Sequence, residues 1–131
     1  MAPRIPKGKV FSVEEANGLL PKICGLFEEI HRELRIQEDM KPDVERAAKQ
    51  AERGGGGIPG GVNYIASVLR MKNQLAEIRS FGVEVKDIRK GLCDFPCRRE
   101  GKLVYLCWHL GEEKIGFWHD IRKGFQGRQT L

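Results

Sequence analysis

The side chains best suited to chemistry gather in the last third of the chain. Asp94, Glu112 and His119 are groups that can move a proton, and Arg128 could hold an anion beside them. No motif for an activated nucleophile accompanies them, so their catalytic role stays open. The residues that we consider as candidates for a ligand site or an interface are Asp94, Tyr105, Trp108, His109, Glu112, Trp118, His119, Asp120 and Arg128.

Elements that alternate in polarity must position these side chains. After Gly82 the apolar residues recur with a period of two, which predicts antiparallel strands within residues 83–121. Residues 98–101 and 111–114 have the length and chemistry of hairpin loops. If each loop has these four residues, Cys97 pairs with Lys102 and Leu110 pairs with Ile115.

This register sorts the strand residues onto two faces. The apolar face, expected to pack on helices, carries Cys93, Phe95, Val104, Leu106, Trp108, Leu110, Ile115, Phe117 and His119. The mixed face, where a site is expected, carries Leu92, Asp94, Leu103, Tyr105, Cys107, His109, Gly116, Trp118 and Asp120. There Tyr105 separates Asp94 from Asp120, and the two carboxylates lie two strands apart, roughly 9–10 Å between backbones.

The four cysteines do not indicate a metal centre. None belongs to a C-x-x-C pair, and we interpret Cys24, Cys93, Cys97 and Cys107 as small buried thiols in a reducing compartment. Cys93 and Cys97 would lie about 13 Å apart along one strand, and the register puts His109 and His119 on opposite faces. We therefore predict neither a metal nor a cofactor.

The first half of the chain is predicted to be helical. Ser12 and Glu15 have the spacing of a capping box, and apolar residues at intervals of three and four continue to about residue 39 with Pro21 inside. This gives a helix over 12–39, a short polar helix over 43–52 and a Gly-rich loop over 54–61 that lacks the P-loop pattern. A second long helix covers 62–80, with an apolar stripe drawn from Val62, Ile65, Val68 or Leu69, Lys72, Leu75 or Ala76, and Ile78.

Together these elements predict one α+β domain over residues 1–131. An N-terminal antiparallel helical hairpin packs on a C-terminal antiparallel β-meander of three to four strands, and residues 122–131 form a loop-like tail. The net charge of +5 is spread along the chain among acidic residues, which argues against nucleic-acid binding as its role. No apolar run can span a membrane, and the N-terminus lacks a signal peptide, so we expect a cytoplasmic protein.

The sequence resembles a bacterial family catalogued as domain of unknown function 2203 over nearly its whole length. The resemblance rests on Phe11–Asn17 with Leu20-Pro21, Val85–Asp87, Gly91–Pro96, Leu106–Glu112, Phe117–His119 and Gly124–Arg128. It implies no activity. It stresses Asp94, Trp108, Glu112, Trp118, His119 and Arg128, and it is not specific for cysteine at Cys93 and Cys97.

Three functions remain open. The first is a binding or interaction module that self-associates as a homodimer, because Leu92, Leu103, Tyr105 and Trp118 would form a large apolar patch on the mixed face. Such a module could also bind a small molecule. The second is a small hydrolase-like acid–base enzyme that uses the C-terminal Asp, Glu and His residues. The third is a weak nucleic-acid binder using Arg98, Arg99 and Lys102.

Overall fold

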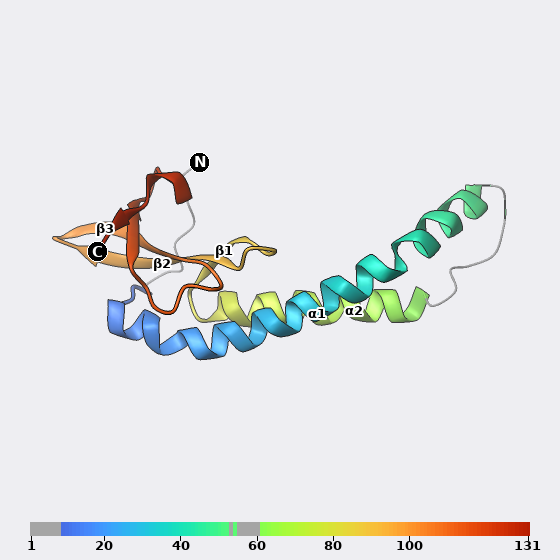
Figure 1. Cartoon of the computed structure of the whole chain (residues 1–131), viewed down its shortest axis with the longest axis horizontal. Helices are drawn as coiled ribbons and strands as arrows, with labels where there is room; N and C mark the ends of the chain where they lie inside the picture. Colours follow the sequence, from blue (N-terminus) through green and yellow to red (C-terminus); the bar gives the residue numbers. More distant parts are fainter. Residues whose placement is uncertain (1–8, 53, 55–60) are drawn as a thin grey trace.

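The computed structural model describes residues 9–52, 54 and 61–131, and it shows an α+β layout (Figure 1). Helices α1 (Val13–Glu52) and α2 (Gly61–Ser80) form an antiparallel hairpin beside a five-stranded antiparallel sheet of order β1-β2-β3-β4-β5. The strands are β1 (Glu84–Asp87), β2 (Leu92–Arg99), β3 (Lys102–Trp108), β4 (Phe117–Asp120) and β5 (Gln129–Thr130), with the 3-10 helix η1 (Phe125–Gly127) before β5. The predicted fold class is confirmed.

The predicted loop-like tail is wrong in one respect, because it contributes the fifth strand. Thr130 pairs with Phe117 and Gln129 pairs with Trp118. Two paired residues are too few to produce a period of two in the sequence. The tail is therefore part of the sheet, and it returns the chain to β4.

Helix α1 begins as predicted and continues further than predicted. The Ser12 hydroxyl accepts a hydrogen bond from the Glu15 amide, and the Glu15 carboxylate accepts one from the Ser12 amide, each 3.0 Å long. The predicted break near residues 40–42 is wrong: Pro42 lies inside one helix that ends at Glu52. A proline removes one backbone donor and bends a helix without having to end it. Most of the predicted Gly-rich loop (residues 55–60) lies outside the described residues.

A buried polar contact fixes how the two helices of the hairpin align. Glu33 on α1 is 7% exposed. It accepts hydrogen bonds from the Ser67 hydroxyl (2.8 Å) and from Nε and Nη2 of Arg70 (2.9 and 3.0 Å) on α2. The Arg70 guanidinium holds the pKa of the Glu33 carboxyl below its usual range. A charged group buried here without these donors would be costly, so the contact specifies the register of the hairpin.

The sheet covers only one end of the hairpin. The turn between β1 and β2 reaches Glu38, which forms an ion pair with Arg89 (2.7 Å). Beyond it the hairpin runs on as an arm, residues 39–52 and 61–69, that extends past the sheet (Figure 1). Among the described residues, no helix combines the length and the apolar character needed to cross a membrane.

The β2–β3 pairing differs from the predicted register by two residues. The loop consists of Glu100 and Gly101 alone, both with positive φ (52° and 76°), and Arg99 pairs with Lys102. Such a two-residue loop matches the right-handed twist of the strands. A shift of two keeps every side chain on its predicted face, but it places Cys107, not Tyr105, opposite Asp94.

The β3–β4 pairing differs by one residue, which turns β4 over. Tyr105 pairs with His119 and Leu106 with Trp118. The predicted four-residue hairpin is wrong, because the connection runs from His109 to Gly116. The backbone amide of Ile115 donates to Oδ1 of Asn17 on α1 (2.7 Å), so this connection is tied to the helices. His119 thus joins the face of Tyr105, and Trp118 joins the opposite face.

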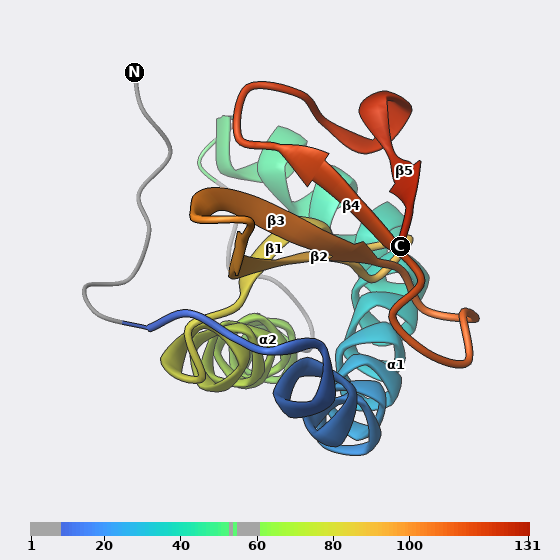
Figure 2. The same cartoon turned by 90° about the vertical axis from the view of Figure 1, so that its left-hand side faces the viewer.

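The helix-facing side of the sheet and the helices share one core. Cys93, Phe95 and Cys97 of β2 and Val104, Leu106 and Trp108 of β3 are buried in the same cluster as Ile23, Phe27 and Ile30 of α1 and Ile78 of α2. Figure 2 shows the sheet lying across the two helices. Four residues on the outer side of the sheet are also buried: Asp94, Tyr105, Cys107 and His119 are between 1% and 4% exposed.

Gly91, between β1 and β2, requires glycine for two reasons. Its φ is +63°, and a Cβ at this position would lie 2.7 Å from Cβ of Leu110. We expect Gly91→Ala to lower the free energy of unfolding by about 1–3 kcal/mol or more, since left-handed strain adds to a clash. Gly101→Ala is the matched control, because it has φ +76° and no neighbour within 4 Å. Equal losses in urea unfolding would contradict a steric role of Leu110.

Candidate functional site

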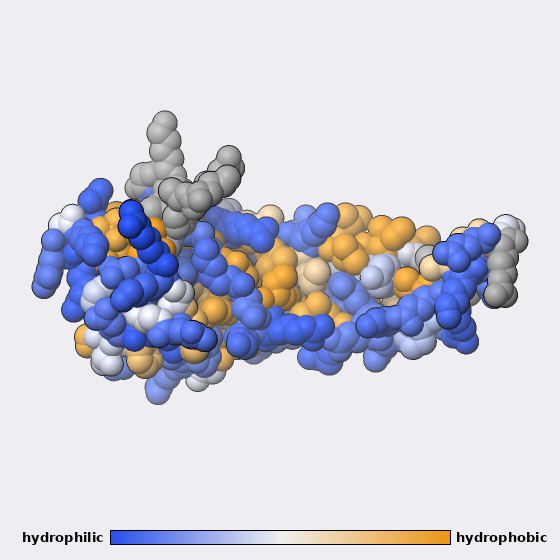
Figure 3. Space-filling model, turned by 90° about the horizontal axis from the view of Figure 1, so that it is seen from above, coloured by the Kyte–Doolittle hydropathy of each residue, from blue (hydrophilic) through white to orange (hydrophobic). Residues whose placement is uncertain are grey.

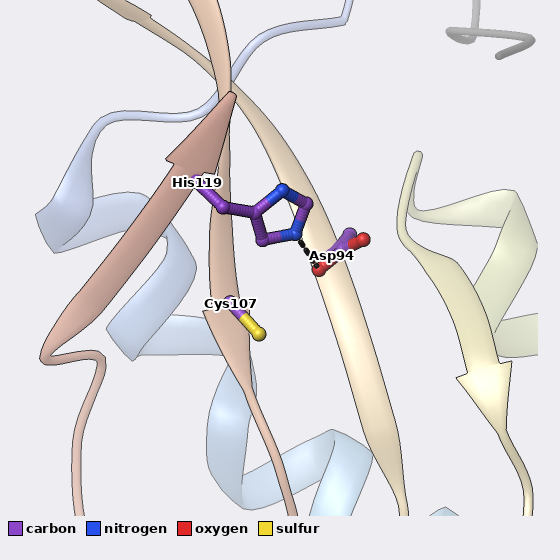
Figure 4. A group of neighbouring side chains, drawn as sticks. All are labelled: Asp94, Cys107 and His119. Atoms are coloured by element: carbon purple, nitrogen blue, oxygen red, sulfur yellow. Dashed lines mark hydrogen bonds and ion pairs between the residues drawn. The ribbon is translucent and has the colours of Figure 1, made fainter. Parts of the chain in front are cut away.

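Three buried side chains with different chemistries meet on the outer side of the sheet. Asp94 comes from β2, Cys107 from β3 and His119 from β4, so that neighbouring strands supply one residue each. A carboxylate oxygen, the thiol sulfur and a ring nitrogen all lie within 4.8 Å of one another. Figure 4 shows the imidazole between the strands, directed at Asp94 with the Cys107 sulfur close by. We call these residues the Asp–Cys–His cluster.

The imidazole of His119 is held at both nitrogens. Nδ1 lies 2.8 Å from the carbonyl oxygen of Asp120, and Nε2 lies 3.0 Å from Oδ1 of Asp94. Since a carbonyl oxygen can only accept, Nδ1 carries a proton. Burial alone would lower the pKa of His119, but hydrogen bonds to Asp94, Cys107 and the Asp120 carbonyl outweigh it and raise the pKa to about 10. At neutral pH His119 and Asp94 therefore form a buried ion pair.

Tyr105 borders this cluster on β3. Its ring lies 5.6 Å from that of His119, centroid to centroid. Its hydroxyl is buried and has no hydrogen-bond partner among the described residues, and the same is true of Oε2 of Glu84. Burial raises the pKa of Tyr105, and the Glu84 carboxylate raises it further. The tyrosine is therefore a neutral phenol beside the Asp94–His119 pair.

A second polar cluster closes the end of the sheet around Glu112. Its Oε1 accepts hydrogen bonds from Nη2 of Arg128 (2.6 Å) and from the amide of His109 (2.9 Å), and its carbonyl accepts one from Nε1 of Trp108 (2.8 Å). The Arg128 guanidinium also lies 3.9 Å from the ring centroid of Phe117. Nε of Arg128 is buried without a hydrogen-bond partner among the described residues. The contacts of Glu112 with Arg128, His109 and Trp108 nevertheless tie the β3–β4 connection to the tail.

The remaining candidates lie apart from both clusters. Trp118 lies under the guanidinium of Arg99, 5.1 Å from the ring centroid, and Asp120 forms an ion pair with Lys102 (3.1 Å). The predicted register put both side chains on the face of Asp94, but they pair with Leu106 and Val104 and therefore lie on the opposite face. Sequence reasoning also missed Cys107 as a site residue. A two-residue hairpin loop would have shown it, because that loop places Cys107 opposite Asp94.

An apolar stripe on α2 is the second candidate surface. Ser67, Leu75 and Ile78 face the protein interior. Of these, Leu75 and Ile78 belong to the predicted stripe, and of its alternatives Val68 and Leu69 the first is half-buried. Val62, Ile65 and Leu69 are instead 82%, 60% and 54% exposed. Figure 3 shows hydrophobic surface gathered along the arm, with hydrophilic residues at its border. We call Val62, Ile65 and Leu69 the α2 stripe.

Residues 9–131 match the model of a protein family described as uncharacterized conserved protein DUF2203. The chain belongs to this family. No curated protein and no solved structure matched the chain. The resemblance to DUF2203 inferred from the sequence motifs is thereby confirmed.

The positions that the DUF2203 motifs stress fall into separate places in the structure. Asp94 and His119 form the buried ion pair. Glu112 and Arg128 belong, with Trp108, to the second polar cluster at the end of the sheet, the Glu112–Arg128 cluster. Much of the motif is therefore explained by local structure. The Asp94–His119 pair is the part that packing does not require, because a buried ion pair is seldom more stable than apolar residues of similar size.

Proposed function

We propose that this DUF2203 chain is an interaction module that forms a homodimer through the α2 stripe. The observation that carries the proposal is the exposure of Val62, Ile65 and Leu69 on one face of an arm that extends past the sheet (Figure 1). Their spacing of three and four residues aligns them along one side of the helix, as in a packed helix pair. The mixed sheet face, from which a homodimer was first expected, is a poorer surface because Tyr105 is buried there.

The absence of charge on this part of α2 favours a second copy as the partner. Charged residues make up 31% of the chain, yet none of the nine residues from Gly61 to Leu69 is charged. In a two-fold interface a residue near the axis meets its own copy, so a charge there would meet a like charge. An uncharged apolar stripe has no such conflict.

The architecture of the arm also suits self-association. Two helices alone form a single layer and cannot bury the outer side of either helix. Two such hairpins can pack into a four-helix bundle whose core is made by the facing stripes. The α2 stripe runs from Val62 to Leu69, which corresponds to about 10 Å of helix for this contact.

Light scattering of the full chain during size exclusion tests the proposal. We expect wild-type protein at about twice 14.9 kDa and Ile65→Asp at the monomer mass. A like-charge pair across the interface costs several kcal/mol, so the dissociation constant of the dimer should rise at least ~100-fold. Ile65 is exposed, so the monomer fold should keep its circular dichroism spectrum.

Asn63→Asp is the matched control for this experiment. It adds the same charge to an exposed position of the same helix, about 100° or more around the helix from the α2 stripe. It should remain dimeric. A monomeric wild-type chain at high concentration, or equal effects of the two aspartates, would show that the α2 stripe does not join two copies.

A further inference from the structure

The Asp–Cys–His cluster presents three kinds of ligand atom on a rigid support. Carboxylate oxygen, thiolate sulfur and imidazole nitrogen are all zinc ligands, and a mixed set of this kind suits Zn²⁺ better than a hard cation such as Mg²⁺. Each ligand residue belongs to a central part of the sheet, on three adjacent strands (Figure 4). Separations up to 4.8 Å between the ligand atoms require only small side-chain shifts to surround one ion.

The second hydrogen bond of His119 is the one that metal-binding histidines usually make. Its Nδ1–H donates to the Asp120 carbonyl at 2.8 Å. This bond fixes the ring orientation, and it leaves Nε2 as the nitrogen that can bind an ion once its proton is lost. Nε2 is the nitrogen that faces Asp94 in the cluster.

The contact between Nε2 and Asp94 needs a positive charge between two acceptors. With Nδ1 already protonated, an unprotonated Nε2 and the Asp94 carboxylate would repel each other at 3.0 Å. A proton occupies that place at this distance, and a zinc ion could replace it if the two atoms moved apart to about 3.3 Å, the separation of two ligand atoms in a tetrahedral site. When Zn²⁺ binds, Nε2 loses its proton and the Cys107 thiol loses its own, so two protons leave as one dication enters.

We infer that Asp94, Cys107 and His119 form a zinc site, with the fourth position of the ion open to a ligand from outside this set. The proposal replaces the predicted absence of a metal. That prediction relied on the distance between Cys93 and Cys97 and on a register that put His109 and His119 on opposite faces. The β3–β4 pairing shows that register to be wrong, because it brings His119 to the face of Asp94 and Cys107. A zinc site would also account for a buried thiol, carboxylate and imidazole that the core does not need for packing.

Cobalt substitution tests the site directly. The three residues are at most 4% exposed, so the full chain is unfolded with chelator, freed of metal and refolded with Co²⁺. We expect one Co²⁺ per chain, with visible bands of a tetrahedral ion and a near-ultraviolet sulfur-to-cobalt charge-transfer band. Zinc added in equal amount should displace the cobalt and remove both bands. A refolded wild-type chain without bound cobalt would overturn the proposal.

Two cysteine variants locate the sulfur ligand. Cys107→Ser should lose the charge-transfer band and weaken Zn²⁺ binding by more than the ~10–100-fold typical of outer-shell changes. Cys97→Ser is the matched control, because Cys97 is also buried on the sheet but packs toward the helices. It should keep the band and the affinity. Loss of the band in Cys97→Ser but not in Cys107→Ser would refute the assignment, and the wild-type result decides alone if Cys107→Ser does not fold.

Discussion

Replacing Asp94 with alanine is expected to lower the free energy of unfolding of the metal-free protein by about 3–5 kcal/mol, the usual loss when one partner of a buried ion pair is removed. The side chains of His119 and Asp94 are 2% and 5% exposed, and their contact is 3.0 Å long. Alanine would leave Nε2 of His119 without its partner where water has little access. Urea unfolding followed by circular dichroism measures the loss.

Asp94→Asn is the control that separates charge from shape. The amide keeps the size of the carboxylate and an oxygen that can accept from His119, so a smaller loss of about 1–3 kcal/mol is expected. Both variants are compared with wild type at one protein concentration, because the proposed dimer would make the apparent stability depend on concentration. A loss below ~1 kcal/mol for Asp94→Ala would show that the pair is exposed or replaceable.

The elements that the sequence predicted correctly are those with strong local signals. Ser12 and Glu15 sit three residues apart and form the capping box, because both hydrogen bonds close within one helical turn. Ile23, Phe27 and Ile30, from the middle of the apolar stripe of α1, are fully buried. Periodicity reports burial reliably where one face of a helix meets one core.

Strand register was predicted less well, because it depends on contacts distant in sequence. The β2–β3 loop has two residues, and the positive φ of Glu100 could not be read from its residue type. The β3–β4 connection is held by Glu112 and by the hydrogen bond from Ile115 to Asn17. The two residues of that hydrogen bond are 98 positions apart in the sequence. A slip of one residue exchanges the faces of a whole strand.

That slip is the reason why the candidate site was only half predicted. Asp94 and His119 were both named from their chemistry, but the predicted register put them on opposite faces. Cys107 was set aside as a small apolar residue, a sound default for a buried cysteine without a neighbouring cysteine. Only the pairing of three strands brings the three side chains together.

The extent of the arm was missed for a different reason. The sequence predicts a helix break near Pro42, and it predicts that Val62, Ile65 and either Val68 or Leu69 pack within the hairpin. The structure keeps one helix through Pro42 and leaves these three side chains exposed. An apolar stripe predicts that a helix face is buried, but it does not say whether the covering surface belongs to the same chain.

Replacing Trp108 with alanine is expected to lower the free energy of unfolding by about 3–5 kcal/mol, the range for a large aromatic residue in a core. Trp108 is fully buried against the helices, and its Nε1 donates to the Glu112 carbonyl at 2.8 Å. It therefore joins the core to the Glu112–Arg128 cluster that fixes the tail. Amide exchange in β4 and β5 should accelerate more than in β1 and β2.

Trp108→Phe divides this effect between packing and hydrogen bonding. Phenylalanine fills much of the ring volume but cannot donate to the Glu112 carbonyl, so we expect a loss of about 1–3 kcal/mol, the cost of a buried acceptor left without its donor. Exchange in β4 and β5 should still accelerate, because Glu112 also positions Arg128 through a 2.6 Å contact. If Trp108→Phe left both stability and exchange unchanged, the ring would act by packing alone, and the tail would be held by Arg128 without help from the indole.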